Sequence, residues 1–172
     1  MSIAPSVWFT ILYCPLPGQG ALAVECRDDD RETLTLLAHL HHRETVLATI
    51  AERSFMKTLE GGCSVPVAVN SKVLEDGLEL EGGVWSIDGQ EKLTGKKTVS
   101  FADGADLDGD MEPQKKKCRS NVNFAAVFAE LLDHSALTAA EKCGRLLAND
   151  LISLGAGRIL REAKAANDTK QT

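Results

Sequence analysis

The pattern of hydrophobic and polar positions predicts a helix followed by a strand meander in the middle of the chain. Hydrophobic residues recur at helical spacing from about Glu44 to Leu59, and the Gly61-Gly62 pair ends that pattern. Three segments with strand character follow, separated by Asp-Gly turn signals, at residues 65–74, 78–87 and 93–101. Such short turns predict an antiparallel sheet, and the helices supply the cover for one of its faces.

Upstream of this region, the pattern predicts one further strand and one further helix. The Gly18-Gln19-Gly20 sequence predicts a turn that enters a short buried strand over residues 21–27. Asp28-Asp29-Asp30 then provides an N-cap for a helix that continues to about His41.

Downstream, the pattern is helical. Hydrophobic residues in 124–132 recur at helical spacing, and Thr138-Ala139-Ala140-Glu141 has the form of a capping box that opens a longer helix. Gly155 and Gly157 end that helix, and residues 158–167 predict a last short one. The fold class predicted is α+β: a three-stranded antiparallel sheet with helices packed on it, preceded by a strand and a helix.

Composition and charge narrow the functional classes. The 172 residues carry a net charge of -6, which argues against a nucleic-acid binder that works by phosphate neutralisation. No apolar run reaches the ~20 residues of a membrane span, and the apolar stretch 1–14 lacks the basic start of a signal peptide. Five cysteines at irregular spacings, without a C-x-x-C pair, favour a reducing compartment, so we expect a cytoplasmic protein. Residues 103–112 are acidic and 115–119 basic, a pattern typical of solvated surface.

Cys63 is the strongest candidate for chemistry. It follows two glycines at the predicted junction between helix and strand, and Pro66 discourages the helix from resuming. A small buried hydrophobe is the ordinary role of a cysteine and remains an alternative. The negative end of the preceding helix and the neighbouring Glu60 disfavour a thiolate, so a covalent attachment point fits better than a nucleophile used in every turnover.

Other polar groups support simpler interpretations. His39, His41 and His42 lack a carboxylate or thiol at matching helical offsets, so we expect an exposed helix end and no metal site. Glu25 and Arg27 share one face of the predicted strand and are expected to form structural ion pairs. The Glu52-Arg53 pair interrupts an otherwise apolar helix pattern and could anchor that helix to another domain through charge-assisted hydrogen bonds.

Four sequence blocks resemble porphobilinogen deaminase, the hydroxymethylbilane synthase family. The blocks are Gly18-Gln19-Gly20-Ala21-Leu22-Ala23-Val24-Glu25, Ile50-Ala51-Glu52-Arg53, Leu59-Glu60-Gly61-Gly62-Cys63-Ser64-Val65-Pro66-Val67-Ala68 and Gly82-Gly83-Val84-Trp85-Ser86. The resemblance is strong over residues 18–101 and looser over 120–168, whereas residues 1–17 do not resemble the family. It implies a divergent, irregular leader over 1–17, a remnant of the family's first domain over 18–43, and the C-terminal cofactor-anchoring α+β domain over 44–172.

The resemblance implies a transferase of tetrapyrrole and haem biosynthesis. Members of the family condense four porphobilinogen units with release of ammonia on a covalently attached dipyrromethane primer. Carried over, Cys63 is the residue of thioether attachment, Gln19 lies near the cofactor, and Ser64 and Val65 flank the attachment site. The expected partners are porphobilinogen and the growing pyrrole chain, with no nucleic acid, membrane or metal, and a monomer is expected.

The resemblance also sets a limit on activity. The family's catalytic aspartate and its substrate-binding arginines lie upstream of the matched blocks, so no catalytic residue is expected here and the chain alone is expected to be inactive. Residues 1–17 suggest an alternative start or a truncated gene model. The alternative function is a non-catalytic module without cofactor; a thiol-dependent hydrolase is disfavoured because Cys63 has no evident base.

Overall fold

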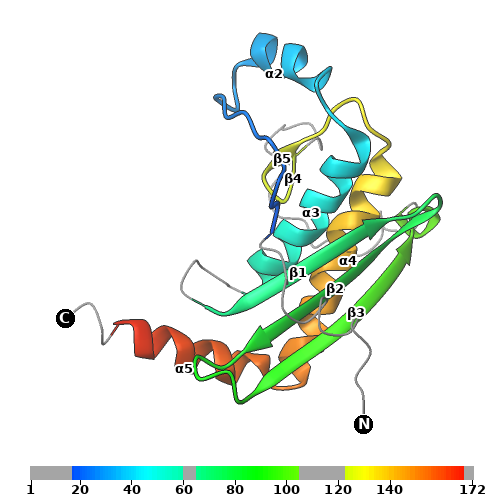
Figure 1. The fold of residues 1–172 in the computed structure, drawn as a ribbon. Coiled ribbons are helices and arrows are strands. Elements are labelled where there is room, and N and C mark those ends of the chain that lie inside the picture. The colour runs from blue at the N-terminus through cyan, green and yellow to red at the C-terminus, as the bar shows by residue number, and fades with distance from the viewer. Residues whose placement is uncertain (1–16, 60–64, 105–122, 169–172) are drawn as a thin grey trace, which may run out of the picture.

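A three-stranded antiparallel sheet forms the centre of the fold (Figure 1). The computed structural model describes residues 17–59, 65–104 and 123–168. The strands β1 (Val67–Val73), β2 (Gly77–Trp85) and β3 (Lys92–Ser100) pair in the order β1-β2-β3. The helices α3 (Arg43–Thr58) and α4 (His134–Ser153) cover one face of the sheet. This architecture confirms the predicted α+β class and the predicted meander.

The buried face of the sheet explains the strand pattern of the sequence. Leu78, Leu80 and Val84 alternate along β2 and are fully buried beneath the helices. Gly82 belongs to the same face, and a Cβ added there would lie 2.7 Å from the Cζ atom of Phe55. The missing side chain therefore leaves room for the aromatic ring of α3 against the sheet.

Helices α3 and α4 approach each other closely at Gly144. A Cβ added at Gly144 would lie 2.1 Å from the carbonyl oxygen of Ala51 and 2.6 Å from the amide nitrogen of Phe55. Beside this crossing, the Ser54 hydroxyl donates a hydrogen bond of 2.7 Å to the carbonyl oxygen of Glu141. The two helices are thus held at backbone-to-backbone contact, and this contact fixes how α3 lies on the sheet.

The first helix forms as predicted, but the strand before it does not. Helix α2 (Arg31–Ala38) begins at Asp30, whose side chain accepts a hydrogen bond from the Thr33 amide. Residues 21–27 form no strand; Leu22 is fully exposed and Val24 largely so. A strand forms only beside a partner, and the described ranges place none next to this segment. The predicted strand is therefore corrected to an exposed segment without regular secondary structure.

The helix expected over residues 124–132 is also corrected. Two short strands, β4 (Asn123–Phe124) and β5 (Val127–Phe128), pair there as a hairpin. Ala125 and Ala126 form its turn with φ values of 46° and 65°, in the left-handed region that a right-handed helix cannot include. Two contacts hold this backbone: Arg53 Nε donates to the Ala125 carbonyl at 3.0 Å, and the Ala125 amide donates to Glu141 Oε1 at 2.9 Å.

The C-terminal helices follow the prediction except at one start. Helix α4 begins one turn earlier than the predicted capping box, with Asp133 as N-cap, because Asp133 accepts a hydrogen bond from the Ser135 amide. Glu141, the last member of that box, binds the Ala125 amide instead of a helix terminus. Gly155 ends α4 with a φ of 107°, as predicted, and α5 (Ala156–Asp168) follows.

Candidate functional site

The loop that carries Cys63 connects α3 to β1. Cys63 and Ser64 lie outside the described residues, but both ends of the loop are described. Leu59 caps α3 and is buried, with its amide donating to the Phe55 carbonyl at 3.1 Å. Val65 is half-buried at the other end, where its carbonyl oxygen accepts from the Val67 amide at 2.9 Å. The predicted junction between a helix end and a strand start is confirmed on both sides of the cysteine.

The strand side of the loop is fixed by the end of β2. The Trp85 amide donates to the Pro66 carbonyl at 2.9 Å. The Trp85 ring folds back over Gly83, where an added Cβ would lie 2.6 Å from the ring. The second glycine of the Gly82-Gly83 pair thus accommodates Trp85, as the first accommodates a ring of α3. In the sequence the Gly82-Gly83 pair belongs to one of the blocks that resemble the family. In the structure it leaves room for two aromatic rings, and Trp85 is also bonded to Pro66 at the start of β1.

Gln19 projects from a tight turn. Gly18 and Gly20 have φ values of 69° and 86°, and the Ala21 amide donates to the Gly18 carbonyl at 3.0 Å. A positive φ at the third position of such a four-residue turn favours glycine strongly. Gln19 occupies the second position, and its side chain is exposed. The predicted glycine turn is confirmed.

Glu52 connects the Gln19 turn to α3 and β1. The Glu52 residue is 9% exposed. One oxygen of its carboxylate accepts from the Gly18 amide at 2.7 Å, and the other accepts from the Ser71 hydroxyl on β1. Charged hydrogen bonds from the Glu52-Arg53 pair are present, since Arg53 binds the β4–β5 turn and Glu52 binds the Gln19 turn. That the pair anchors α3 to another domain stays a prediction.

The polar groups upstream of α3 form local contacts. Arg27 lies 3.9 Å from Asp29 and from Asp30 in exposed ion pairs, and no ion pair to Glu25 is found in the described part of the chain. His39 and His42 bond to Thr35 and Thr45 within their own helical turns. Burial lowers the pKa of His41. Within residues 17–59, 65–104 and 123–168, no group of three or more metal-ligating side chains gathers.

The two described cysteines, Cys26 and Cys143, have different surroundings. Cys143 is fully buried in α4, and burial raises the pKa of its thiol to about 12. Its Sγ atom lies 3.7 Å from the Lys97 carbonyl oxygen, to which it donates. Cys143 is therefore a packed core thiol, as most cysteines are. Cys26 is exposed, on the segment before α2.

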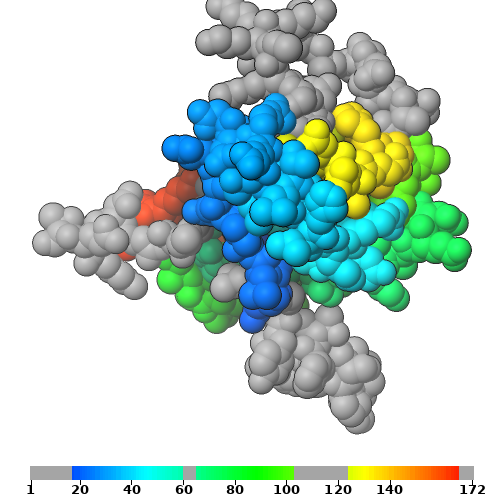
Figure 2. Space-filling view, turned by 90° about the horizontal axis from the view of Figure 1, so that it is seen from above, coloured from blue at the N-terminus to red at the C-terminus, as the bar shows by residue number. Residues whose placement is uncertain are grey.

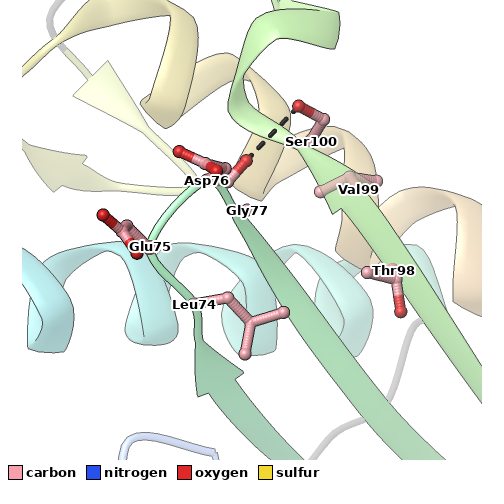
Figure 3. Close-up of a pocket in the computed structure, with 7 residues that line it drawn as sticks. All are labelled: Leu74, Glu75, Asp76, Gly77, Thr98, Val99 and Ser100. Carbon is pink, nitrogen blue, oxygen red and sulfur yellow. Dashed lines mark hydrogen bonds between the residues drawn. The ribbon is translucent and has the colours of Figure 1, made fainter.

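An open depression lies at the opposite end of β1 from the cysteine loop (Figure 3). It is lined by residues 74–77 of the β1–β2 turn and by Thr98, Val99 and Ser100 of β3. The Ser100 hydroxyl donates to the Asp76 carbonyl at 3.3 Å and closes the turn. The depression lies at the far end of β1 from the segment that carries Cys63, so it is not part of the candidate site.

The segment that carries Gln19 lies beside α3, to which the hydrogen bond from Gly18 to Glu52 joins it (Figure 2). Among the described residues, no helix is long and apolar enough to cross a membrane.

Three described residues support the Gln19 turn or the ends of the segment that carries Cys63, although the sequence analysis did not assign them to the site: Glu52, Ser71 and Trp85. Of these, Glu52 left a sequence signal, because a carboxylate on the buried face of an amphipathic helix requires a partner.

Comparison with known proteins identifies the matched region. Residues 46–112 match the sequence model described as porphobilinogen deaminase, C-terminal domain. The chain is 52% identical over 92 residues to the porphobilinogen deaminase of Neurospora crassa, covering 50% of this chain and 27% of that protein. It is 37% identical over 150 residues to that of Pelotomaculum thermopropionicum, covering 87% of this chain and 36% of the relative.

A third relative, the porphobilinogen deaminase of Shouchella clausii, is 52% identical over 90 residues, which cover 52% of this chain and 29% of that protein. The chain thus spans about a third of the length of the curated relatives it matches. The matched region, residues 46–112, includes most of α3 and the whole three-stranded sheet of the α+β fold. The chain therefore resembles the C-terminal portion of proteins named porphobilinogen deaminase.

Proposed function

We propose that this chain is the cofactor-anchoring portion of a hydroxymethylbilane synthase, with Cys63 as the point of thioether attachment for a dipyrromethane group. The observation that carries the proposal is the position of the Gly61-Gly62-Cys63 motif. It lies between the end of α3 and the start of β1, inside the region that matches the family's C-terminal domain. An anchoring thiol needs to react only once, which suits a cysteine beside a helix C-terminus.

Attachment forms one carbon–sulfur bond and expels one small molecule. With porphobilinogen as donor, the bond from the aminomethyl carbon to nitrogen breaks, and the thiol proton leaves with the amine as ammonia; a second porphobilinogen then bonds to the free ring carbon, and that carbon's proton leaves with the second amine as ammonia. With hydroxymethylbilane as donor, the hydroxyl group and the thiol proton leave as water and four rings are attached; hydrolysis of the link between the second and third rings, which returns a hydrogen to the second ring and a hydroxyl to the released methylene, would leave the dipyrromethane. Ser64 and Val65 flank the sulfur in this proposal, and Gln19 contacts the attached group. Porphobilinogen is the proposed substrate of the whole protein, and the irregular cysteines favour a cytoplasmic location.

Intact-mass measurement tests the attachment. The purified chain is incubated with hydroxymethylbilane, and peptide mapping locates any pyrrole adduct. We expect an adduct on Cys63 that is absent from Cys63→Ser and retained by Cys26→Ser, a control that removes an exposed thiol. An unmodified Cys63 after this treatment, or equal modification of Cys26, would contradict the proposal. The unmodified result would favour the alternative of a non-catalytic module without cofactor.

The second part of the proposal is that this chain alone does not condense porphobilinogen. Condensation requires a carboxylate near the pyrrole nitrogen and cations that hold several substrate carboxylates. The sequence motifs that match the family do not supply this set. We therefore expect no ammonia release above that of a heat-denatured sample when the purified chain is incubated with porphobilinogen. Sustained ammonia release would refute the inactivity, while leaving the anchoring role of Cys63 to the mass measurement.

A further inference from the structure

Glu52 occupies a position where a carboxylate is costly. It lies on the buried face of α3, near Ala51 and Phe55, which are fully buried in the hydrophobic core. A carboxylate removed from water loses hydration that only well-placed hydrogen bonds replace, and an apolar side chain of similar size would usually stabilise such a site better. The two hydrogen bonds of Glu52 therefore point to a role beyond core packing.

The two hydrogen bonds join three segments that are distant in sequence. One oxygen of Glu52 accepts from the backbone amide of Gly18, and the other from the Ser71 hydroxyl at the middle of β1. Charge-assisted hydrogen bonds of this kind are stronger and more directional than neutral ones. The carboxylate thus fixes the first residue of the Gln19 turn relative to both α3 and β1.

The turn itself has little side-chain packing to hold it. Among the described residues, a Cβ added at Gly18 or at Gly20 would meet nothing within 4 Å, and both glycines have a positive φ. Residues 22–27 beyond the turn are exposed. Glu52 lies two helical turns before Leu59, or about 10 Å along the axis from the end of α3 where the Cys63 loop starts. This separation suits contact between Gln19 and a group tethered to that loop.

We propose that Glu52 is a positioning residue, which holds the Gln19 turn against the helix and strand that flank the Cys63 loop. The purpose of this positioning rests on the proposed function, but the hydrogen bonds from Glu52 to the Gln19 turn and to β1 can be tested without the cofactor. Glutamine can replace Glu52 in both contacts, because its oxygen can accept from the Gly18 amide and its amide group can donate to the Ser71 hydroxyl. Alanine can form neither contact.

Amide hydrogen exchange of the whole chain, followed by NMR, tests the geometry. In Glu52→Ala, we expect the Gly18 and Ala21 amides to exchange about tenfold faster or more, with a smaller change at Ala68 and Leu80 in the sheet. Glu52→Gln should restore most of the protection. A uniform acceleration at all four amides, or unchanged rates at Gly18 and Ala21, would overturn the inference.

Ser71→Ala keeps the test decisive if Glu52→Ala does not fold. It removes one of the two hydrogen bonds without burying a new polar group, and we expect an acceleration at Gly18 that is a few-fold and smaller than that of Glu52→Ala. Thr98→Ala on the exposed side of β3 serves as the matched control and should leave Gly18 unchanged. Equal rates at Gly18 in Ser71→Ala and Thr98→Ala would count against the inference.

Adduct formation separates this inference from the proposed function. If the wild-type chain acquires a pyrrole adduct at Cys63, contact between the adduct and Gln19 should slow trypsin cleavage after Arg27 relative to the adduct-free chain. Glu52→Ala should retain the adduct but lose this difference in cleavage, and Glu52→Gln should keep it. If the wild-type chain acquires no adduct, the proposed function fails while the amide result still decides the positioning role. If adduct-bearing Glu52→Ala keeps the wild-type difference in cleavage, the link between the turn and the anchor is wrong.

Discussion

Close approaches of backbone and rings explain several glycines of this chain. Gly82 and Gly83 lie at neighbouring positions of β2 and accommodate Phe55 and Trp85 on opposite faces of the sheet. Gly144 is different, because its neighbours are backbone atoms of α3 that cannot rotate away. A pattern of hydrophobic residues carries no sign of such a contact, and Gly144 was therefore invisible to sequence reasoning.

Replacing Gly144 by alanine should destabilise the fold. The added methyl group would overlap the Ala51 carbonyl and the Phe55 amide, so α3 and α4 must move apart. Overpacking of this kind typically costs about 1–3 kcal/mol, and we expect a value at the upper end in urea unfolding. Gly157→Ala in α5 is the matched control, because its Cβ would meet only an Arg161 side-chain nitrogen at 3.5 Å. That variant should be neutral or more stable by up to about 1 kcal/mol; equal losses in both variants would contradict the packing argument.

At the site, the sequence predicts the glycine turn around Gln19 and the junction that carries Cys63. Both predictions use local signals, namely positive-φ glycines and a change of hydrophobic period. Glu52 and Ser71 meet across 19 residues and Glu52 and Gly18 across 34. No local pattern specifies such partners, so their contact became visible only in the fold.

Among the helices, the start of α4 illustrates competition between two possible caps. The Thr138–Glu141 box has the right spacing, but Asp133 lies one turn earlier and its carboxylate accepts from the Ser135 amide and hydroxyl. The hydrogen bond from the Ser135 side chain, followed by backbone amides, lowers the pKa of Asp133. Glu141 does not serve in a cap, because its carboxylate accepts a hydrogen bond from the Ala125 amide. Asp133 and Thr138 are both suitable N-caps by local sequence, and tertiary contacts determine which of them starts α4.

Removal of the Asp133 cap should reduce stability in a pH-dependent manner. Asp133→Ala leaves helix amides unpaired, and we expect a loss of about 1 kcal/mol at pH 7. Because the folded-state pKa of Asp133 is lowered, its stabilisation is present above the unfolded-state value of about 4 and disappears as the pH falls through the folded-state value. The difference between wild type and Asp133→Ala in urea unfolding should therefore shrink below about pH 4. Asp133→Asn keeps a neutral cap and should show a weaker dependence on pH; parallel profiles for all three proteins would argue against the charge effect.

For the whole molecule, the α+β architecture follows from the sequence because its sheet is a meander of neighbours. Each Asp-Gly turn places the next strand beside the previous one, so local signals suffice to specify the topology. The segment 21–27 begins with an apolar run that is typical of a buried strand, but it has no adjacent hairpin partner in the described residues. Its strand prediction was wrong for that reason: an apolar run indicates the capacity to pair, and pairing itself depends on another segment.

This difference predicts two levels of protection within one chain. In β1 and β2 the ladder from Val67–Val84 to Val73–Leu78 is bonded and lies over the core, so its central amides should open only with global unfolding. In residues 22–27, Leu22 and Val24 are exposed, and no backbone amide of the segment donates to another backbone carbonyl among the described residues. Mass-spectrometric hydrogen exchange should show the peptide that covers 22–27 exchanged within seconds, while the peptide that covers 67–73 stays protected for orders of magnitude longer. This outcome would support the proposed division into an autonomous unit over 44–172 and a dependent segment over 18–43. Comparable protection of both peptides would require a pairing partner for residues 22–27, and would return them to the strand that their sequence first predicted.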